Sequence, residues 1–147
     1  MFNPQKILVA TAFTAESDKA LREARILAEK FGSTVHLINV IEDIQQCGGD
    51  YCLSEGEILA EKNKLREEAV NKMNEEIRRI MTGSPVTLVT EIRFGNALDE
   101  ILTYERDKNI DLVITAPHRK HKRRGLLNHH LAEQLTKKSV CEAMVVR

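Results

Sequence analysis

The 147-residue chain is predicted to fold as an α/β protein with an open five-stranded parallel sheet and helices on both of its faces. Short runs of apolar, β-branched residues recur along the chain, as in strands that are buried on both sides. Segments with apolar residues at helical spacing separate these runs, and this alternation is typical of parallel sheets. The length suits a single domain over residues 1–147.

The first unit is a strand, a helix and a second strand. Residues 6–11 form a continuous apolar run of the kind found in a central strand, and residues 35–41 form another. Between them, Thr14 is placed to cap a helix and Gly32 to end it. The apolar residues of that helix recur at helical spacing: Ala20, Leu21, Ala24, Leu27, Ala28 and Phe31. A right-handed crossover makes the two strands parallel.

The middle of the chain adds a loop, a long helix and a half-exposed strand. Residues 42–53 are polar and glycine-containing, which predicts a loop. Ser54 and Glu57 have the spacing of a capping box, and the charged helix behind them runs to about residue 81. Apolar and polar residues alternate over residues 86–93, so this strand is expected at an edge of the sheet.

The last third supplies two more strands. Asn96 is placed to cap a short helix, and residues 112–114 form a fourth buried strand. A helix is expected over residues 126–138 and a fifth strand over residues 143–147. A flavodoxin-like strand order would place a ligand crevice between the first and fourth strands.

Charge and composition exclude several classes of function. The chain has 22 basic and 22 acidic residues and no formal net charge, so no overall field draws it to nucleic acid or to a membrane. The polar start, Met1 to Lys6, is not a signal peptide, and the apolar run from Ile7 to Ala12 is too short to span a bilayer. Three cysteines do not make a secreted disulfide framework. We therefore expect a cytoplasmic, reduced protein without a membrane partner.

Six stretches, taken together and in this order, resemble the universal stress protein family, UspA-like. They are residues 6–14, 20–27, 36–40, Gly95, 110–114 and 144–147. The resemblance implies a sheet in the order 3-2-1-4-5, as in flavodoxin-like and adenine nucleotide alpha hydrolase-like folds. It also implies a homodimer that pairs through the last strand. The family has a branch that binds ATP and a branch that does not.

The residues at the family's ATP-binding positions resemble the branch that does not bind ATP. The binding branch carries Gly-x2-Gly-x9-Gly-[Ser/Thr] after the fourth strand, and these positions fall on Ala116, Arg119, His129 and His130. Glycine lets the backbone approach phosphate closely, whereas these side chains add bulk there. The family's acidic residue after the first strand falls on Ala12. We therefore expect a degenerate nucleotide site without ATP as a cofactor.

Two further residues complete the candidate site at the ends of the first two strands. Val40 stands at a position that contacts adenine in the family, and Thr11 precedes Ala12. We interpret both as candidate nucleotide-binding positions.

The basic segment 118–124 leaves two interpretations open. Its cationic side chains, Arg119 and Arg123 among them, could hold phosphate or another anion beside a helix N-terminus. A solvated loop is the favoured interpretation, because charge runs are usually exposed faces. Nucleic-acid binding is not expected, since the segment has no aromatic residue for base stacking.

The cysteines and histidines give no catalytic or metal site. Cys47 and Cys52 are expected as two thiols in a mobile loop that could form a disulfide under oxidation, and no second ligand pair completes a zinc site. Cys141 is expected in the core or an interface, and His36 as a structural histidine within a strand. No nucleophile and base have a recognisable spacing, so we expect no enzymatic activity.

The last strand is expected to form the dimer interface. Its residues Ala143, Met144, Val145 and Val146 are apolar, and an apolar edge strand is a template for pairing with another chain. The sequence thus predicts a stress-response domain that acts through dimerisation and protein partners. The alternative is a nucleotide or anion sensor that uses the loop 118–124. A nucleotide hydrolase is a third possibility, for which no base or metal ligand stands out.

Overall fold

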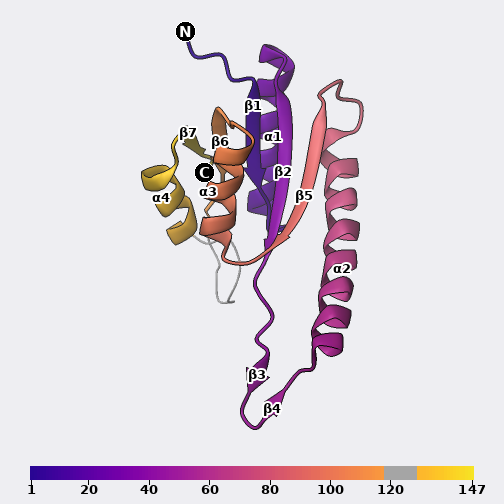
Figure 1. The fold of residues 1–147 in the computed structure, drawn as a ribbon. Helices are drawn as coiled ribbons and strands as arrows, with labels where there is room; N and C mark the ends of the chain where they lie inside the picture. Colours follow the sequence, from indigo (N-terminus) through magenta and orange to yellow (C-terminus); the bar gives the residue numbers. More distant parts are fainter. Residues whose placement is uncertain (118–128) are drawn as a thin grey trace.

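The computed structural model describes residues 1–117 and 129–147, and its central element is a parallel five-stranded sheet (Figure 1). Across the sheet, the strands are β5 (Leu88–Phe94), β2 (Thr34–Ile41), β1 (Lys6–Ala10), β6 (Leu112–Thr115) and β7 (Glu142–Val145). All four pairings between neighbours are parallel. This order is the predicted 3-2-1-4-5, so the predicted fold class is confirmed.

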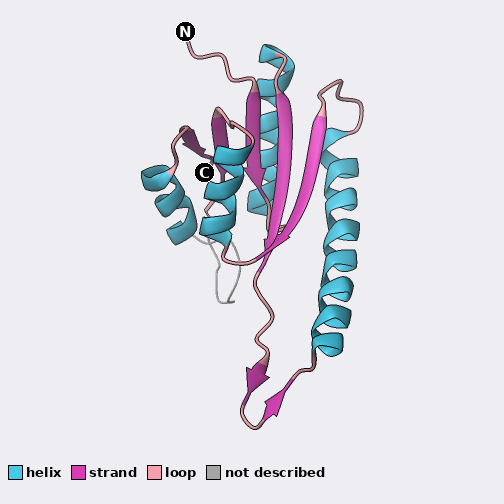
Figure 2. Cartoon of the chain, viewed as in Figure 1, coloured by secondary structure: helices cyan, strands magenta, loops and turns pink. Residues whose placement is uncertain are grey.

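Helices pack on both faces of the sheet (Figure 2). They are α1 (Ala15–Phe31), α2 (Glu55–Met81), α3 (Ala97–Asp107) and α4 (His129–Lys138). Helices α1 and α2 share one apolar core with the sheet, built around Ile7, Val9 and Leu37. Helices α3 and α4 share the other core, built around Leu8 and Ile38. Successive strand residues point to opposite faces, which is why neighbours such as Leu8 and Val9 belong to different cores.

The predicted helix ends are present as specific contacts. The Thr14 side chain accepts a hydrogen bond from the Ser17 amide, and Gly32 ends α1 in the left-handed conformation at φ 72°. Ser54 and Glu57 form the reciprocal capping box of α2. Asn96 caps α3. These side chains satisfy amides that the first turn of a helix leaves unpaired.

The central strands of the sheet are more deeply buried than its edge strands. Strand β6 is buried along its whole length, and β1 is buried from Ile7 onward. Strand β5 is half exposed, as the alternation in its sequence predicts. At the opposite edge, β7 pairs with β6 alone among the described strands.

One prediction about the loop after β2 is wrong. This segment forms a small antiparallel hairpin, β3 (Cys47–Gly48) and β4 (Tyr51–Cys52), and the two cysteines are joined as a disulfide rather than left as free thiols. The hairpin register places Cys47 directly opposite Cys52, so the two side chains leave the same face of the ribbon. Sequence spacing alone did not show that register.

The basic segment 118–124, with Arg119 and Arg123, lies outside the described residues, as does the side chain of His129. No helix in the described part of the chain is long and apolar enough to cross a membrane.

Candidate functional site

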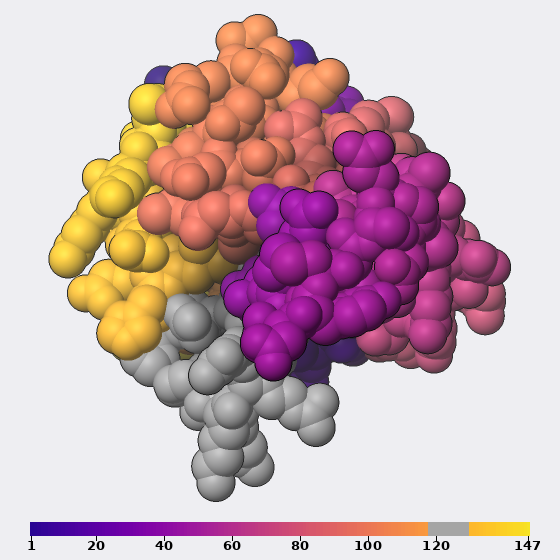
Figure 3. Space-filling model, turned by 60° about the horizontal axis from the view of Figure 1, so that its bottom comes forward, coloured from indigo at the N-terminus to yellow at the C-terminus, as the bar shows by residue number. Residues whose placement is uncertain are grey.

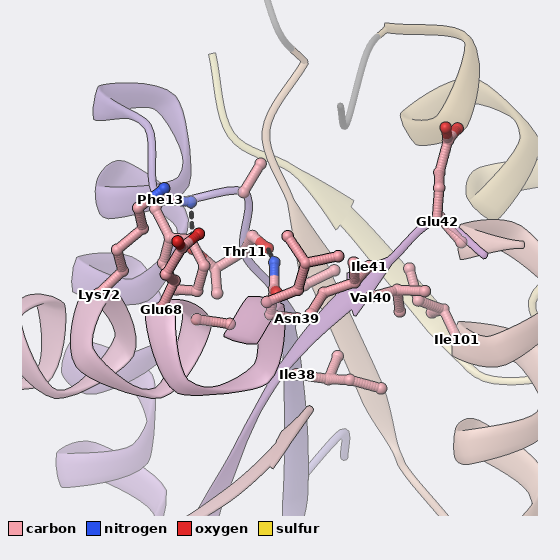
Figure 4. A pocket seen from close by; sticks show the side chains of 15 residues that line it. Thr11, Phe13, Ile38, Asn39, Val40, Ile41, Glu42, Glu68, Lys72 and Ile101 are labelled. Carbon is pink, nitrogen blue, oxygen red and sulfur yellow. Dashed lines mark hydrogen bonds between the residues drawn. The ribbon is translucent and has the colours of Figure 1, made fainter. Parts of the chain in front are cut away.

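A cavity of about 310 Å³ opens where β1 and β2 end (Figure 4). The chain after β1 and the end of β2 form two of its sides, α2 covers a third, and α3 closes the fourth. Carboxyl ends of parallel strands are where ligands bind in open α/β sheets. The described lining residues are Ala10, Thr11, Ala12, Phe13, Ile38, Asn39, Val40, Ile41, Glu42, Leu65, Glu68, Ala69, Lys72, Ala97 and Ile101.

Thr11 anchors the floor of this pocket. Its hydroxyl donates to a carboxylate oxygen of Glu76 at 2.9 Å and accepts from the Phe13 amide at 3.0 Å. The Asn39 side-chain amide donates to the Thr11 carbonyl at 2.8 Å. These bonds hold the chain after β1 in place, including Phe13 at a positive φ of 59°. Thr11 is 2% exposed, so its hydroxyl is a structural group of the pocket floor.

The charged side chains of the described lining are mostly acidic. Glu42 follows β2, and Glu68 and Lys72 lie one turn apart on α2, on the side of the pocket formed by Phe13 (Figure 4). Val40 and Ile101 give the opposite side an apolar surface. Carboxylates accept hydrogen bonds from hydroxyl groups and repel phosphates. The described part of the pocket lining therefore suits an apolar ring that carries hydroxyl groups better than a polyanion.

A buried acidic pair lies behind the pocket floor. Glu76 on α2 is fully buried, and burial, followed by its interaction with Asp18 on α1, raises its pKa to about 8. Glu76 Oε2 accepts from Thr11, whereas Glu76 Oε1 and Asp18 Oδ1 have no hydrogen-bond partner among the described residues. Glu76 therefore carries a proton at neutral pH that the two unpartnered oxygens can share. Arg79 pairs with the other Asp18 oxygen at 2.6 Å.

Sequence reasoning missed Glu76, although a signal was present. Glu76 lies three residues after Met73 and four before Ile80, so it interrupts the apolar stripe of α2. A charged residue on a buried stripe indicates a specific partner or a shifted pKa. Glu68 and Lys72 were also missed, because the face that α2 turns to the strand ends is fixed by tertiary packing.

The predicted site residues are brought together only in part. Thr11, Ala12 and Val40 lie in the pocket. Ala116 follows β6 and is buried in the core shared with α1, outside the described lining. The described lining comes from the ends of β1 and β2 and from α2 and α3. His130 is exposed in the first turn of α4.

The other polar candidates have structural partners. Nδ1 of His36 lies 2.6 Å from the Tyr104 hydroxyl, and burial lowers the pKa of this histidine. The Cys141 thiol donates to Glu105, and burial raises its pKa to about 12. Over the described ranges 1–117 and 129–147, no group of three or more His, Cys, Asp or Glu residues could hold a metal ion.

The fold defines a flavodoxin-like α/β protein, with a crevice at the carboxyl ends of β1 and β2. A family model described as the universal stress protein family matches residues 3–147. The chain belongs to that family. No curated protein matches the chain.

Solved structures show the same architecture. The universal stress protein UspA from Lactobacillus plantarum has a TM-score of 0.77 at 18% identity, with 97% of each chain covered. The protein MJ0577 also has a TM-score of 0.77, at 26% identity, with 99% of this chain and 96% of that chain covered. A universal stress protein in complex with cAMP has a TM-score of 0.71 at 12% identity, with 99% of this chain and 98% of that chain covered.

Proposed function

We propose that this protein is a non-enzymatic, cytoplasmic universal stress protein that acts in the stress response as a homodimer, through protein partners, and does not use ATP. The observation that carries the proposal is the pocket at the ends of β1 and β2. Its described charged lining is two carboxylates, Glu42 and Glu68, against one ammonium group, Lys72. A triphosphate entering this side meets net repulsion.

The chain after β1 supports the same conclusion. Ala12, where ATP-binding relatives are expected to carry an acidic residue, presents only a methyl group and can neither accept from a ribose hydroxyl nor bind a metal ion. Its amide donates to Ser17 Oγ at 3.0 Å and is therefore already used. At the phosphate-loop positions, Ala116 stands in place of a glycine and is buried in the core.

The free edge of β7 supports the homodimer. Ala143 to Val146 are half-buried, and the described strands leave one side of β7 unpaired. Closed two-fold pairing is the commonest way to satisfy such an edge.

A small-nucleotide or anion sensor is the second candidate function. Two structural relatives are described as complexes with cAMP and with dAMP. The apolar surface of Val40, Ala97 and Ile101 would suit a nucleobase, and segment 118–124 would supply the positive charge for one phosphate.

A thermal-shift series separates the two functions. ATP, AMP, cyclic AMP and sulfate are compared at matched ionic strength, because a ligand at 100 times its Kd stabilises the folded state by about 2.7 kcal/mol. The main proposal expects no stabilisation by the three nucleotides and, because sulfate stabilises folded proteins generally, the same sulfate effect in the wild type and in Arg119→Ala with Arg123→Ala. Stabilisation by cyclic AMP or sulfate that is lost in Arg119→Ala with Arg123→Ala would establish the sensor instead.

A further inference from the structure

The disulfide hairpin β3–β4 connects two sides of the pocket. It projects from the end of the molecule where β2 stops (Figure 1, lower end), and its strand residues are exposed. The purple part of the chain, which includes the hairpin, reaches the surface in Figure 3. Before the hairpin, Ile41 and Glu42 line the pocket, and after it α2 contributes Leu65 and Glu68. Residues 43–54 are therefore the covalent link between the β2 side and the α2 side of the cavity.

Few interactions besides the disulfide hold the hairpin closed. Its strands have two residues each, and both cysteines are exposed. Outside the strands, the Leu53 amide donates to the Gln46 carbonyl at 2.7 Å, and the Gln46 side chain donates to the Leu53 carbonyl at 3.3 Å. An isolated two-stranded hairpin is only marginally stable in water. Breaking the Cys47–Cys52 bond is therefore expected to open it.

The hairpin is coupled directly to the start of α2. The Tyr51 hydroxyl donates to Glu57 Oε2 at 2.6 Å. The other oxygen of Glu57 accepts from the Ser54 amide at 3.1 Å, and this bond is half of the α2 capping box. Opening the hairpin removes Tyr51 from Glu57 and frees the first turn of α2 to fray.

We propose that Cys47 and Cys52 form a reversible thiol–disulfide switch that controls the order of the α2 N-terminus, the segment that leads into the α2 side of the pocket. An exposed disulfide that closes a short loop is open to attack and constrains the unfolded chain little, which is typical of exchangeable rather than structural disulfides. The switch does not depend on which ligand the pocket takes.

The co-reactant is a dithiol reductant, or two molecules of a monothiol such as glutathione. A thiolate of the reductant attacks one cysteine sulfur, the S–S bond breaks, and the other sulfur leaves as a thiolate and takes up a proton. The second thiolate of the reductant then displaces the first cysteine from the mixed disulfide. Two electrons and two protons pass to Cys47 and Cys52, and the reductant becomes a disulfide.

The third cysteine is a matched internal control. The Cys141 thiol donates to Glu105 at 3.3 Å and is partly buried beside β7. Burial keeps it protonated, so it is a poor nucleophile for exchange. Modification under mild conditions is therefore confined to the hairpin.

Hydrogen exchange by mass spectrometry tests the switch on the wild-type protein, oxidised and after reduction with dithiothreitol. Iodoacetamide labelling must add two groups only after reduction. Reduction is expected to speed exchange over residues 43–60 by at least about fivefold, as local opening would. Cys47→Ser with Cys52→Ser should exchange at the reduced rate under both conditions, and oxidised Tyr51→Phe should lose protection over residues 55–60.

Two outcomes would overturn the proposal. One is equal exchange of the α2 N-terminus in the oxidised and reduced protein. The other is a disulfide that excess dithiothreitol does not reduce without denaturant, because such a bond would be structural.

Discussion

At the scale of single residues, Glu76 is the most informative side chain. It is a fully buried side chain of α2, and its carboxylate accepts a hydrogen bond from Thr11 on the pocket floor. Burial and the neighbouring Asp18 raise its pKa from 4.5 to about 8, while Thr11 and Arg79 act in the opposite direction. The folded state therefore favours the protonated acid, and the unfolded state does not.

This difference gives a defined pH dependence. A pKa that is raised on folding contributes stability that is fully present below the unfolded value of 4.5 and is lost as the pH rises toward 8. We expect Glu76→Gln, which keeps an acceptor for Thr11 and adds a donor for Asp18, to remove this loss. Between those two pH values, the free energy of unfolding of the wild type should fall by on the order of a few kcal/mol relative to that of the variant.

Urea unfolding at a series of pH values measures this effect. Glu75→Gln is the matched control, because Glu75 is adjacent and exposed and should leave the slope unchanged. Parallel stability curves for the wild type and Glu76→Gln would contradict the assignment of the proton to Glu76.

At the scale of elements, sequence prediction succeeded where the determinant is local. Thr14, Ser54 and Asn96 were predicted as caps because a cap needs only its own helix's first turn. The hairpin β3–β4 was missed because it depends on the register between two very short strands. The position of Glu68, Lys72 and Glu76 over the strand ends was missed because the rotation of α2 depends on packing against α1 and the sheet.

The α2 cap gives a prediction at this scale. Ser54→Ala removes the acceptor of the Glu57 amide bond at 3.1 Å and should destabilise the protein by about 1 kcal/mol. Ser54→Thr keeps the hydroxyl and should restore most of that stability. Chemical unfolding measures both variants, and equal stability of Ser54→Ala and the wild type would show that the cap contributes nothing.

Strand β7 gives a second prediction. The Glu142 amide donates to the Asp111 carbonyl just before β6, and the Val146 amide donates to Thr115 in β6. Donors alternate sides along a strand, so the Val145 amide faces the free edge. Val145→Pro should therefore disrupt pairing between two copies while leaving the β6 ladder intact. We expect a folded monomer, whereas Met144→Pro, whose amide faces β6, should destabilise the domain itself.

Light scattering with circular dichroism tests the prediction for β7. The wild type is expected to be a dimer at roughly tens of micromolar, a range in which a weak interface remains detectable. A wild-type monomer, or a Val145→Pro dimer, would exclude pairing through this edge.

At the scale of the whole molecule, the alternation of strands and helices was sufficient to predict the fold class, whereas the strand order was predicted from the family resemblance. The site was predictable only in part, because Thr11, Ala12 and Val40 follow strand ends while the α2 side chains reach the pocket across the sheet. The chain also combines zero formal net charge with an acidic majority among the described charged residues of its pocket. Neither the overall field nor this part of the pocket favours a polyanionic ligand.

We propose that the pocket does not bind ATP, and titration calorimetry with ATP and Mg²⁺ is the decisive test. We predict no saturable heat at micromolar ATP and no nucleotide released when the purified protein is denatured. A micromolar Kd, or ATP carried through purification, would show that the pocket binds ATP.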